Sequence, residues 1–244
     1  MNKPHIIGLT GPLSCGKDTV ALLLATHLGF AHVKFADALR AEICAAYGID
    51  ITLTTRRDTK EVPTEALALD RCNSVIFIRA MIDQERGAVG FDLDAFMESP
   101  RSPRQIMQWW GTDYRRQHSG DSYWTRTLTH RIHTQQQGHQ WRYVVSDVRF
   151  RNEVDAIRAL GGVIWQVKRP GLQAGTGHVS EVDGSQFQPD AVINNRHDIR
   201  HLQAVTMAQW LMREASLTAA QVVDVGVAAE AMDEFGPTDP RLGE

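Results

Sequence analysis

The feature that most constrains this 244-residue chain is the stretch GLTGPLSCGKDTVA, from Gly8 to Ala21. It follows the apolar run HIIGLT and leads into the run TVALLLATHL, so its glycines lie between a predicted buried strand and a predicted helix. Gly11, four intervening residues, Gly16 and Lys17 have the spacing of a phosphate-binding loop. In such a loop, backbone N–H groups and the start of the helix surround an anion, and the lysine reaches the terminal phosphates.

The position after the lysine departs from the usual pattern. Asp18 stands where a Ser or Thr hydroxyl normally holds Mg²⁺, and Thr19 comes one residue later. A carboxylate is also a ligand that Mg²⁺ accepts, so Asp18 is a predicted Mg²⁺ ligand. In the alternative, Asp18 caps the helix N-terminus and Thr19 contacts a phosphate oxygen. The sequence leaves both open.

Strand and helix patterns alternate along the chain. The predicted strands are 5–10, 31–35, 141–148, 163–168 and 191–194, and the predicted helices are 19–28, 38–47, 73–86, 103–117, 123–136, 152–160 and 199–214. This alternation predicts an α/β fold, with a parallel sheet between helical layers and a helical insertion. The predicted parts are a nucleotide-binding core of residues 1–48 and 140–215, an insertion of 49–139 and a C-terminal extension of 216–244.

Composition excludes several classes of protein. The net charge of −3 provides no general basic field for nucleic acid or an anionic membrane. Cys15, Cys44 and Cys72 lie far apart, which argues against a disulfide framework and against a zinc site. No apolar run reaches the roughly 18 residues of a membrane-spanning helix, and the N-terminus has no signal-like pattern. We therefore expect a cytoplasmic protein without membrane contacts.

Five segments, in order along the chain, resemble the phage-type deoxynucleoside monophosphate kinases of the P-loop nucleoside monophosphate kinase superfamily. They are GKDT, FADALR (35–40), SPRQIMQWWGTDYRRQ (102–117) with the following SYWT, VVSDVRFRNEVDAIRALGGVIWQVKRPG (144–171), and GHVSEVDG with DAVINN. The match runs discontinuously over about residues 5–205, leaving 49–99 and the tail beyond 216 unmatched. The resemblance implies a three-layer α/β/α P-loop kinase fold whose inserted helices bind the acceptor and form a lid.

The resemblance also implies a reaction and roles for individual residues. The reaction is transfer of the γ-phosphoryl of ATP, with Mg²⁺, to a deoxynucleoside 5′-monophosphate, in a possible homodimer whose partners are small nucleotides rather than a nucleic acid polymer. The implied ATP-binding residues are Gly11, Ser14, Gly16, Lys17, Asp18, Thr19 and Arg169. The implied acceptor-binding residues are Asp37, Arg104, Gly111, Trp124, Asp147, Arg149 and Glu153. Lys17, Asp147 and Arg149 are the implied catalytic residues.

Two other functions also fit the loop. One is another small-molecule P-loop kinase, of the dephospho-coenzyme A or phosphomevalonate type. The other is a regulatory or assembly module that binds a nucleotide without transferring phosphate. Asp147, Arg149 and Glu153 favour a nucleotide kinase, because the resemblance implies that all three contact the nucleotide or stabilise its site.

Overall fold

The computed structural model describes residues 5–137, 140–172 and 187–214. The chain divides into two compact units. Residues Met1–Val33 and Thr134–Glu244 form one, which we call the sheet unit, and Lys34–His133 form the other, which we call the helical unit. These boundaries lie earlier in the chain than the predicted divisions at residues 48 and 139. The predicted extension 216–244 and the GHVSEVDG segment lie outside the described residues.

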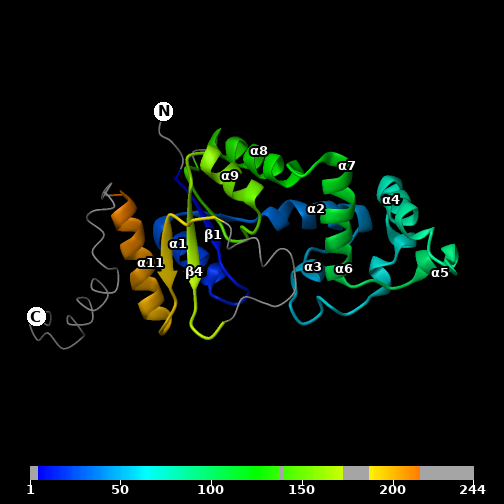
Figure 1. Ribbon diagram of the computed structural model, residues 1–244, viewed down its shortest axis with the longest axis horizontal. Helices are drawn as coiled ribbons and strands as arrows, with labels where there is room; N and C mark the ends of the chain where they lie inside the picture. The colour runs from blue at the N-terminus through cyan, green and yellow to red at the C-terminus, as the bar shows by residue number, and fades with distance from the viewer. Residues whose placement is uncertain (1–4, 138–139, 173–186, 215–244) are drawn as a thin grey trace, which may run out of the picture. The chain divides into compact units, whose positions relative to one another are not determined.

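The sheet unit is built on five parallel strands in the order β2-β3-β1-β4-β5 (Figure 1). The strands are β1 (His5–Thr10), β2 (Ala31–Val33), β3 (Arg142–Val145), β4 (Val163–Lys168) and β5 (Ala191–Asn194). The central strand β1 is almost wholly buried, which is expected of a parallel strand covered on both faces. The phosphate-loop sequence follows directly from this strand.

Helices cover both faces of the sheet. Helices α1 (Lys17–Leu28) and α11 (Ile199–Glu214) share one hydrophobic core with Ile7 and Leu9 of β1. Successive strand residues face opposite sides, and Gly8 lies against Ile157 of α9 (Arg151–Ala159), so α9 covers the other face. The predicted three-layer α/β/α fold with a parallel sheet is therefore confirmed.

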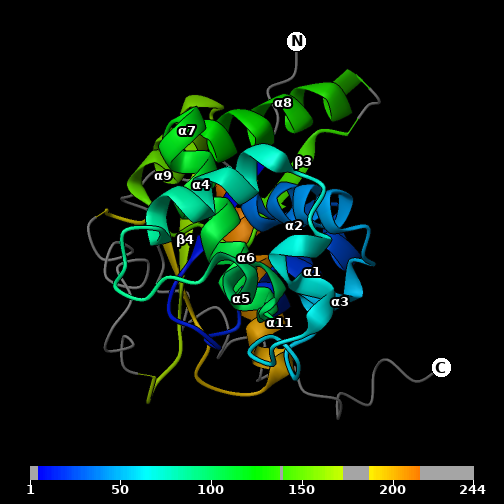
Figure 2. The same ribbon diagram turned by 90° about the vertical axis from the view of Figure 1, so that its right-hand side faces the viewer.

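The helical unit contains short helices and turns. They are α2 (Phe35–Tyr47), α3 (Thr52–Thr55), η1 (Glu65–Leu67), η2 (Leu69–Arg71), α4 (Val75–Glu85), α5 (Leu93–Glu98), α6 (Pro103–Gln108), η3 (Trp109–Arg116), α7 (Gln117–Ser119) and most of α8 (Tyr123–Gln137). Helix α6 contacts α2 and α3 (Figure 2). Phe77, Trp110 and Tyr114 form a buried aromatic cluster, with ring centroids 4.5–5.6 Å apart.

Two predicted elements differ from the structure for local reasons. The strand predicted at 31–35 ends at Val33, because α2 begins at Phe35. The Lys34 N–H donates to Asp37 Oδ2 over 2.9 Å, which fixes the start of that helix. The single helix predicted at 103–117 is instead α6 followed by the π-helix η3. None of the described helices is both long and apolar enough to cross a membrane.

Candidate active site

The phosphate loop has the backbone conformation that its glycines permit. Gly11, Ser14 and Gly16 have φ angles of +137°, +62° and +111°, in the left-handed range. A Cβ on Gly11 would lie 2.3 Å from the Val167 carbonyl oxygen of β4, so the loop passes too close to this strand for any other residue. Left-handed residues among right-handed ones can direct successive backbone N–H groups toward one point, where an anion binds.

The Lys17 side chain lies across the loop. Its Nζ donates to the carbonyls of Gly11 and Pro12 over 2.7 and 2.8 Å. The pKa of Lys17 is lowered, and burial of its ammonium group is the main cause. Of the weaker influences, Cys15 raises this pKa and the positive charge of Arg149 lowers it. Lys17 and Arg149 are thus close enough to repel each other electrostatically. A bound polyanion would relieve that repulsion and would accept hydrogen bonds in place of the loop carbonyls.

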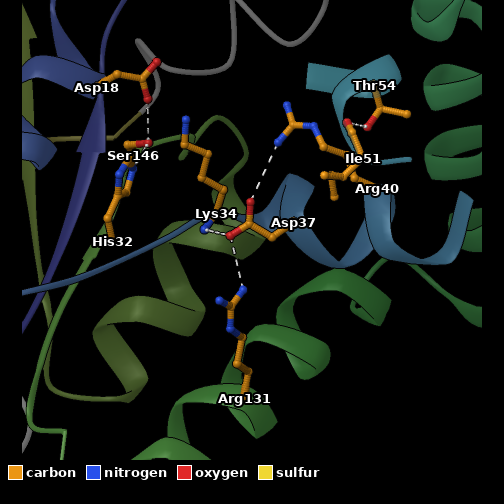
Figure 3. Close-up of polar contacts among 9 residues, drawn as sticks. All are labelled: Asp18, His32, Lys34, Asp37, Arg40, Ile51, Thr54, Arg131 and Ser146. Carbon is orange, nitrogen blue, oxygen red and sulfur yellow. Dashed lines mark hydrogen bonds and ion pairs between the residues drawn. The ribbon is translucent and has the colours of Figure 1, made fainter. Parts of the chain in front are cut away.

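Asp18 contacts Ser146, the residue that follows the neighbouring strand β3. The N-cap residue of α1 is Gly16, so Asp18 itself lies inside the helix, at its second position. Asp18 Oδ1 accepts a 3.0 Å hydrogen bond from the hydroxyl of Ser146, whose Oγ is 2.7 Å from Nε2 of His32 (Figure 3). A carboxylate oxygen is the kind of ligand that Mg²⁺ prefers, and the Ser146 hydroxyl holds this one.

Among the residues that the structure describes, no three His, Cys, Asp or Glu side chains form a complete metal site. The Asp18 carboxylate by itself fits Mg²⁺, which proteins commonly hold through one or two carboxylates while substrate phosphates and water complete the coordination. The residues present are therefore compatible with a magnesium ion that arrives with a nucleotide.

Glu153 organises the turn that follows β3. Its Oε2 accepts hydrogen bonds from the backbone N–H groups of Arg149 (2.7 Å) and Phe150 (3.1 Å), and the residue is only 3% exposed. The carboxylate thereby fixes the backbone at Arg149 and the start of α9. The predicted contacts of Asp147, Arg149 and Glu153 with a nucleotide remain predictions.

Asn195, which directly follows β5, was not among the predicted site residues. Its side-chain Nδ2 donates to the Cys15 carbonyl of the loop over 2.9 Å, and its backbone N–H donates to Lys168 over 2.7 Å. A Cβ on Gly16 would lie 2.8 Å from this amide, so Asn195 packs tightly under the loop. Its position after an apolar strand, at the sheet edge where ligands bind, is the sequence feature that could have identified Asn195 as a site residue.

The predicted adenine contact Arg169 is an exposed residue directly after β4.

Asp37, one of the predicted acceptor-binding residues in the helical unit, holds two arginines. Its Oδ2 accepts from Arg131 Nη1 over 3.1 Å, and its Oδ1 lies 3.7 Å from Arg40 Nη1 (Figure 3). Two guanidinium groups beside one carboxylate leave a net positive site that suits a phosphate group. Arg40, at the end of the FADALR segment, and Arg131 were not among the predicted site residues.

Glu42 is a second hydrogen-bonding centre in the helical unit. Its Oε2 accepts from Trp110 Nε1 and Arg115 Nε, both over 2.7 Å, and its Oε1 accepts from the Tyr123 hydroxyl over 2.5 Å. The Arg115 guanidinium lies 4.8 Å from the ring centroids of both Tyr114 and Tyr123. Burial, followed by the hydrogen bond to Glu42, raises the pKa of Tyr123. Glu42 therefore joins α2, η3 and α8.

Trp124 and Gly111 contact each other directly. The indole N–H of Trp124 donates to the Gly111 carbonyl over 3.1 Å, and Trp124 is 5% exposed. Arg104 forms an ion pair with Glu61 on the surface of the same unit. The predicted acceptor contacts of these residues remain predictions. The remaining predicted site residues, namely Gly11, Ser14, Gly16, Lys17, Asp18, Thr19, Asp147, Arg149, Glu153 and Arg169, belong to the sheet unit.

Comparison with known proteins supplies an independent observation. The family model "Deoxynucleotide monophosphate kinase" matches residues 88–205. This chain is similar to the deoxynucleotide monophosphate kinases. A candidate deoxynucleotide monophosphate kinase of Acanthamoeba polyphaga mimivirus is 27% identical over 193 residues, covering 73% of this chain and 81% of that protein. The deoxynucleotide monophosphate kinase of Enterobacteria phage T4 is 23% identical over 229 residues, covering 81% and 95%.

The region that matches the deoxynucleotide monophosphate kinase family excludes the phosphate loop. It runs from the segment before α5 into α11, and so contains Arg104, Trp124, Arg149 and Asn195 but not Lys17. The loop geometry and the family match are thus separate observations. Among solved structures, the dephospho-CoA kinase from Campylobacter jejuni superposes with a TM-score of 0.41 at 11% identity, covering 86% of this chain and 96% of that one.

Proposed function

We propose that this protein transfers the γ-phosphoryl group of ATP to a deoxynucleoside 5′-monophosphate, giving ADP and the deoxynucleoside diphosphate. The observation that carries the proposal is the phosphate loop, with Lys17 across it, in a chain related to deoxynucleotide monophosphate kinases outside the loop. A kinase needs little covalent chemistry of its own, because most of the rate comes from positioning and from neutralising charge.

On the donor side, the loop N–H groups and the start of α1 bind the ATP phosphates. Lys17 exchanges its two carbonyl partners for phosphate oxygens, and Arg149 adds a second positive charge nearby. A bound Mg²⁺ would supply positive charge against the negative charge that develops on the phosphates during transfer. Asp18 is the residue we assign to hold that ion, and Arg169 the one we assign to the adenine.

On the acceptor side, the phosphate of the monophosphate binds to guanidinium groups. Arg40 and Arg131, both held by Asp37, are suited to this role, and Arg104 is a further candidate from the family resemblance. We assign residues 49–139 to acceptor binding and to a lid that excludes water, which would otherwise accept the phosphoryl group. Amide hydrogen exchange in 49–126 should slow when an adenosine–polyphosphate–deoxynucleoside analogue binds.

The deciding experiment is coupled ADP release with a panel of acceptors. The panel contains the four common deoxynucleoside monophosphates, their ribose counterparts, dephospho-coenzyme A and phosphomevalonate, and Lys17→Ala is the inactive control. The proposal expects turnover with at least one deoxynucleoside monophosphate. Turnover only with dephospho-coenzyme A or phosphomevalonate would assign another kinase, and ATP binding without turnover would assign a regulatory module.

The remaining assignments follow from the same proposal. The partners are small nucleotides rather than a nucleic acid polymer, in keeping with the net charge of −3. The protein acts in the cytoplasm as a homodimer, the state that the family resemblance implies. Light scattering at assay concentrations tests the dimer, and a monomer mass with full activity would reject it.

A further inference from the structure

We propose that Ser146 and His32 are positioning residues that set the Asp18 carboxylate toward the magnesium ion of the bound nucleotide. The inference rests on the nucleotide-binding part of the proposed function. It concerns two residues that lie outside the loop and outside the predicted site.

Three neighbouring elements meet at this point. Asp18 is the second residue of α1, Ser146 directly follows β3, and His32 lies on β2, which pairs with β3. The Ser146 hydroxyl is 3.0 Å from Asp18 Oδ1 and 2.7 Å from His32 Nε2, and Figure 3 shows it between the two side chains. Ser146 is 2% exposed, so bulk water does not substitute for these partners.

The proton positions follow from the chemistry of the three groups. A hydroxyl has one proton, and Ser146 donates it to the Asp18 carboxylate. Ser146 Oγ is then the acceptor toward His32, so the Nε2 of His32 must carry a hydrogen. The chain runs in one direction, from imidazole N–H to hydroxyl to carboxylate. Such a chain fixes the orientation of the Ser146 hydroxyl and the rotamer of the carboxylate.

The contact between Ser146 and Asp18 bears on the unusual residue after Lys17, where Asp18 replaces the usual Ser or Thr. In the usual loop, the residue after the lysine supplies a hydroxyl to the metal. Here that residue is an acid, and the hydroxyl of residue 146, 128 positions further along the chain, donates to its carboxylate. Partners behind a metal ligand orient it, and their removal typically weakens metal binding by about 10- to 100-fold. Ser146 and His32 occupy that position behind Asp18.

The competing explanation is that the His32–Ser146–Asp18 hydrogen bonds are purely structural, because they also join α1 to β2 and β3. The two explanations differ in one quantity. A positioning role predicts a change in the gain in nucleotide affinity that Mg²⁺ provides, whereas a structural role predicts lower stability with that gain unchanged.

The test measures ADP affinity by calorimetry, with Mg²⁺ and with EDTA, in the full-length protein. The variants are Ser146→Ala, His32→Leu, His32→Gln and the double variant Ser146→Ala/His32→Leu. His32→Gln keeps an N–H donor near the Nε2 position. Thr206→Val is the matched control, because it removes another buried hydroxyl of the sheet unit, one that donates within α11 to Leu202.

We expect Ser146→Ala to reduce the Mg²⁺-dependent gain in ADP affinity by about tenfold, the lower end for loss of a partner behind a metal ligand. ADP affinity in EDTA should stay within twofold of the wild type, roughly the scatter of an unaffected site. His32→Leu should act in the same direction, His32→Gln should restore most of the loss, and Thr206→Val should leave the gain unchanged. The double variant should be no worse than Ser146→Ala, because His32 acts through the hydroxyl.

An unchanged Mg²⁺ gain in Ser146→Ala, or fully additive losses in the double variant, would overturn the inference. The proposed function fails separately. If the wild-type protein phosphorylates no monophosphate but its Mg²⁺-dependent ADP binding still needs Ser146, the kinase proposal falls and the positioning role stands. If the wild type is an active kinase and all the variants keep its Mg²⁺ gain, the positioning role falls alone.

Discussion

Replacing Glu42 should separate the loss of a charge from the loss of a hydrogen-bond acceptor. Its carboxylate accepts from the Trp110 indole, the Arg115 guanidinium and the Tyr123 hydroxyl. In Glu42→Ala all three donors lose their partner. In Glu42→Gln, the amide oxygen still serves Trp110 and Arg115, and the amide nitrogen donates to the Tyr123 oxygen, so every group keeps a partner.

The size of each effect follows from burial. Leaving a buried donor unpaired costs about 1–3 kcal/mol. Trp110 is 2% exposed and incurs most of that cost, whereas water partly reaches the Arg115 side chain, which is 24% exposed. We therefore expect Glu42→Ala to lower the free energy of unfolding by about 3 kcal/mol, and Glu42→Gln by about 1 kcal/mol. Glu98→Ala, an exposed acid on α5, should change it by less than about 0.5 kcal/mol.

Urea unfolding followed by circular dichroism gives the free-energy differences, provided that the m-value is the same in all variants. Native-state hydrogen exchange then reports whether the amides of α2, η3 and α8 lose protection together, as expected of elements joined by one carboxylate. Equal losses in the Ala and Gln variants would show that charge, not acceptor geometry, carries the stabilisation. A loss below about 1 kcal/mol in Glu42→Ala would refute the three-donor account altogether.

Three further predictions concern the phosphate loop. Lys17→Ala should lower turnover by about 10²–10⁴ with little change in Tm, as for loss of one electrostatic stabiliser, and undiminished turnover in the coupled assay would contradict the loop assignment. Gly11→Ala places a Cβ 2.3 Å from the Val167 oxygen at φ +137°, so calorimetry should detect no ADP binding; wild-type affinity would contradict the close approach. Asn195→Ala should raise the KM for ATP about three- to tenfold, the equivalent of one hydrogen bond, without changing the KM for the acceptor. Equal rises in both steady-state constants would assign Asn195 a general structural role instead.

Local patterns predicted much of the fold. The strands at 5–10, 163–168 and 191–194 and the helix at 199–214 have the predicted bounds, because continuous apolar runs and helical spacing mark buried parallel strands and a packed helix. The strand at 31–33 was predicted too long because a polar contact, Lys34 to Asp37, decides where α2 begins. The π-helix η3 was not predicted, since a π-helix has no distinctive local sequence pattern.

The candidate site was predictable only in part, for a physical reason. Spacing within GLTGPLSCGKDT is local and sufficed to identify the loop. The contacts of Ser146 with Asp18, and of Asn195 with Cys15, depend on which strands are neighbours in the order β2-β3-β1-β4-β5. No periodicity in the sequence specifies that order. The three donors to Glu42 likewise come from separate segments of the chain.

The hydrogen bond from the Asn195 side chain to the Cys15 carbonyl, which supports the phosphate loop, has a consequence for protein synthesis. Cys15 and Asn195 are 180 residues apart, and the strands that flank β1 begin at Arg142 and Val163. At typical translation rates of about 5–20 residues per second, the loop leaves the ribosome on the order of 10–40 s before Asn195 does. A nascent chain that ends before β5 therefore carries the loop sequence without its support. Nucleotide can therefore stabilise the complete site only after β5 and Asn195 have been synthesised.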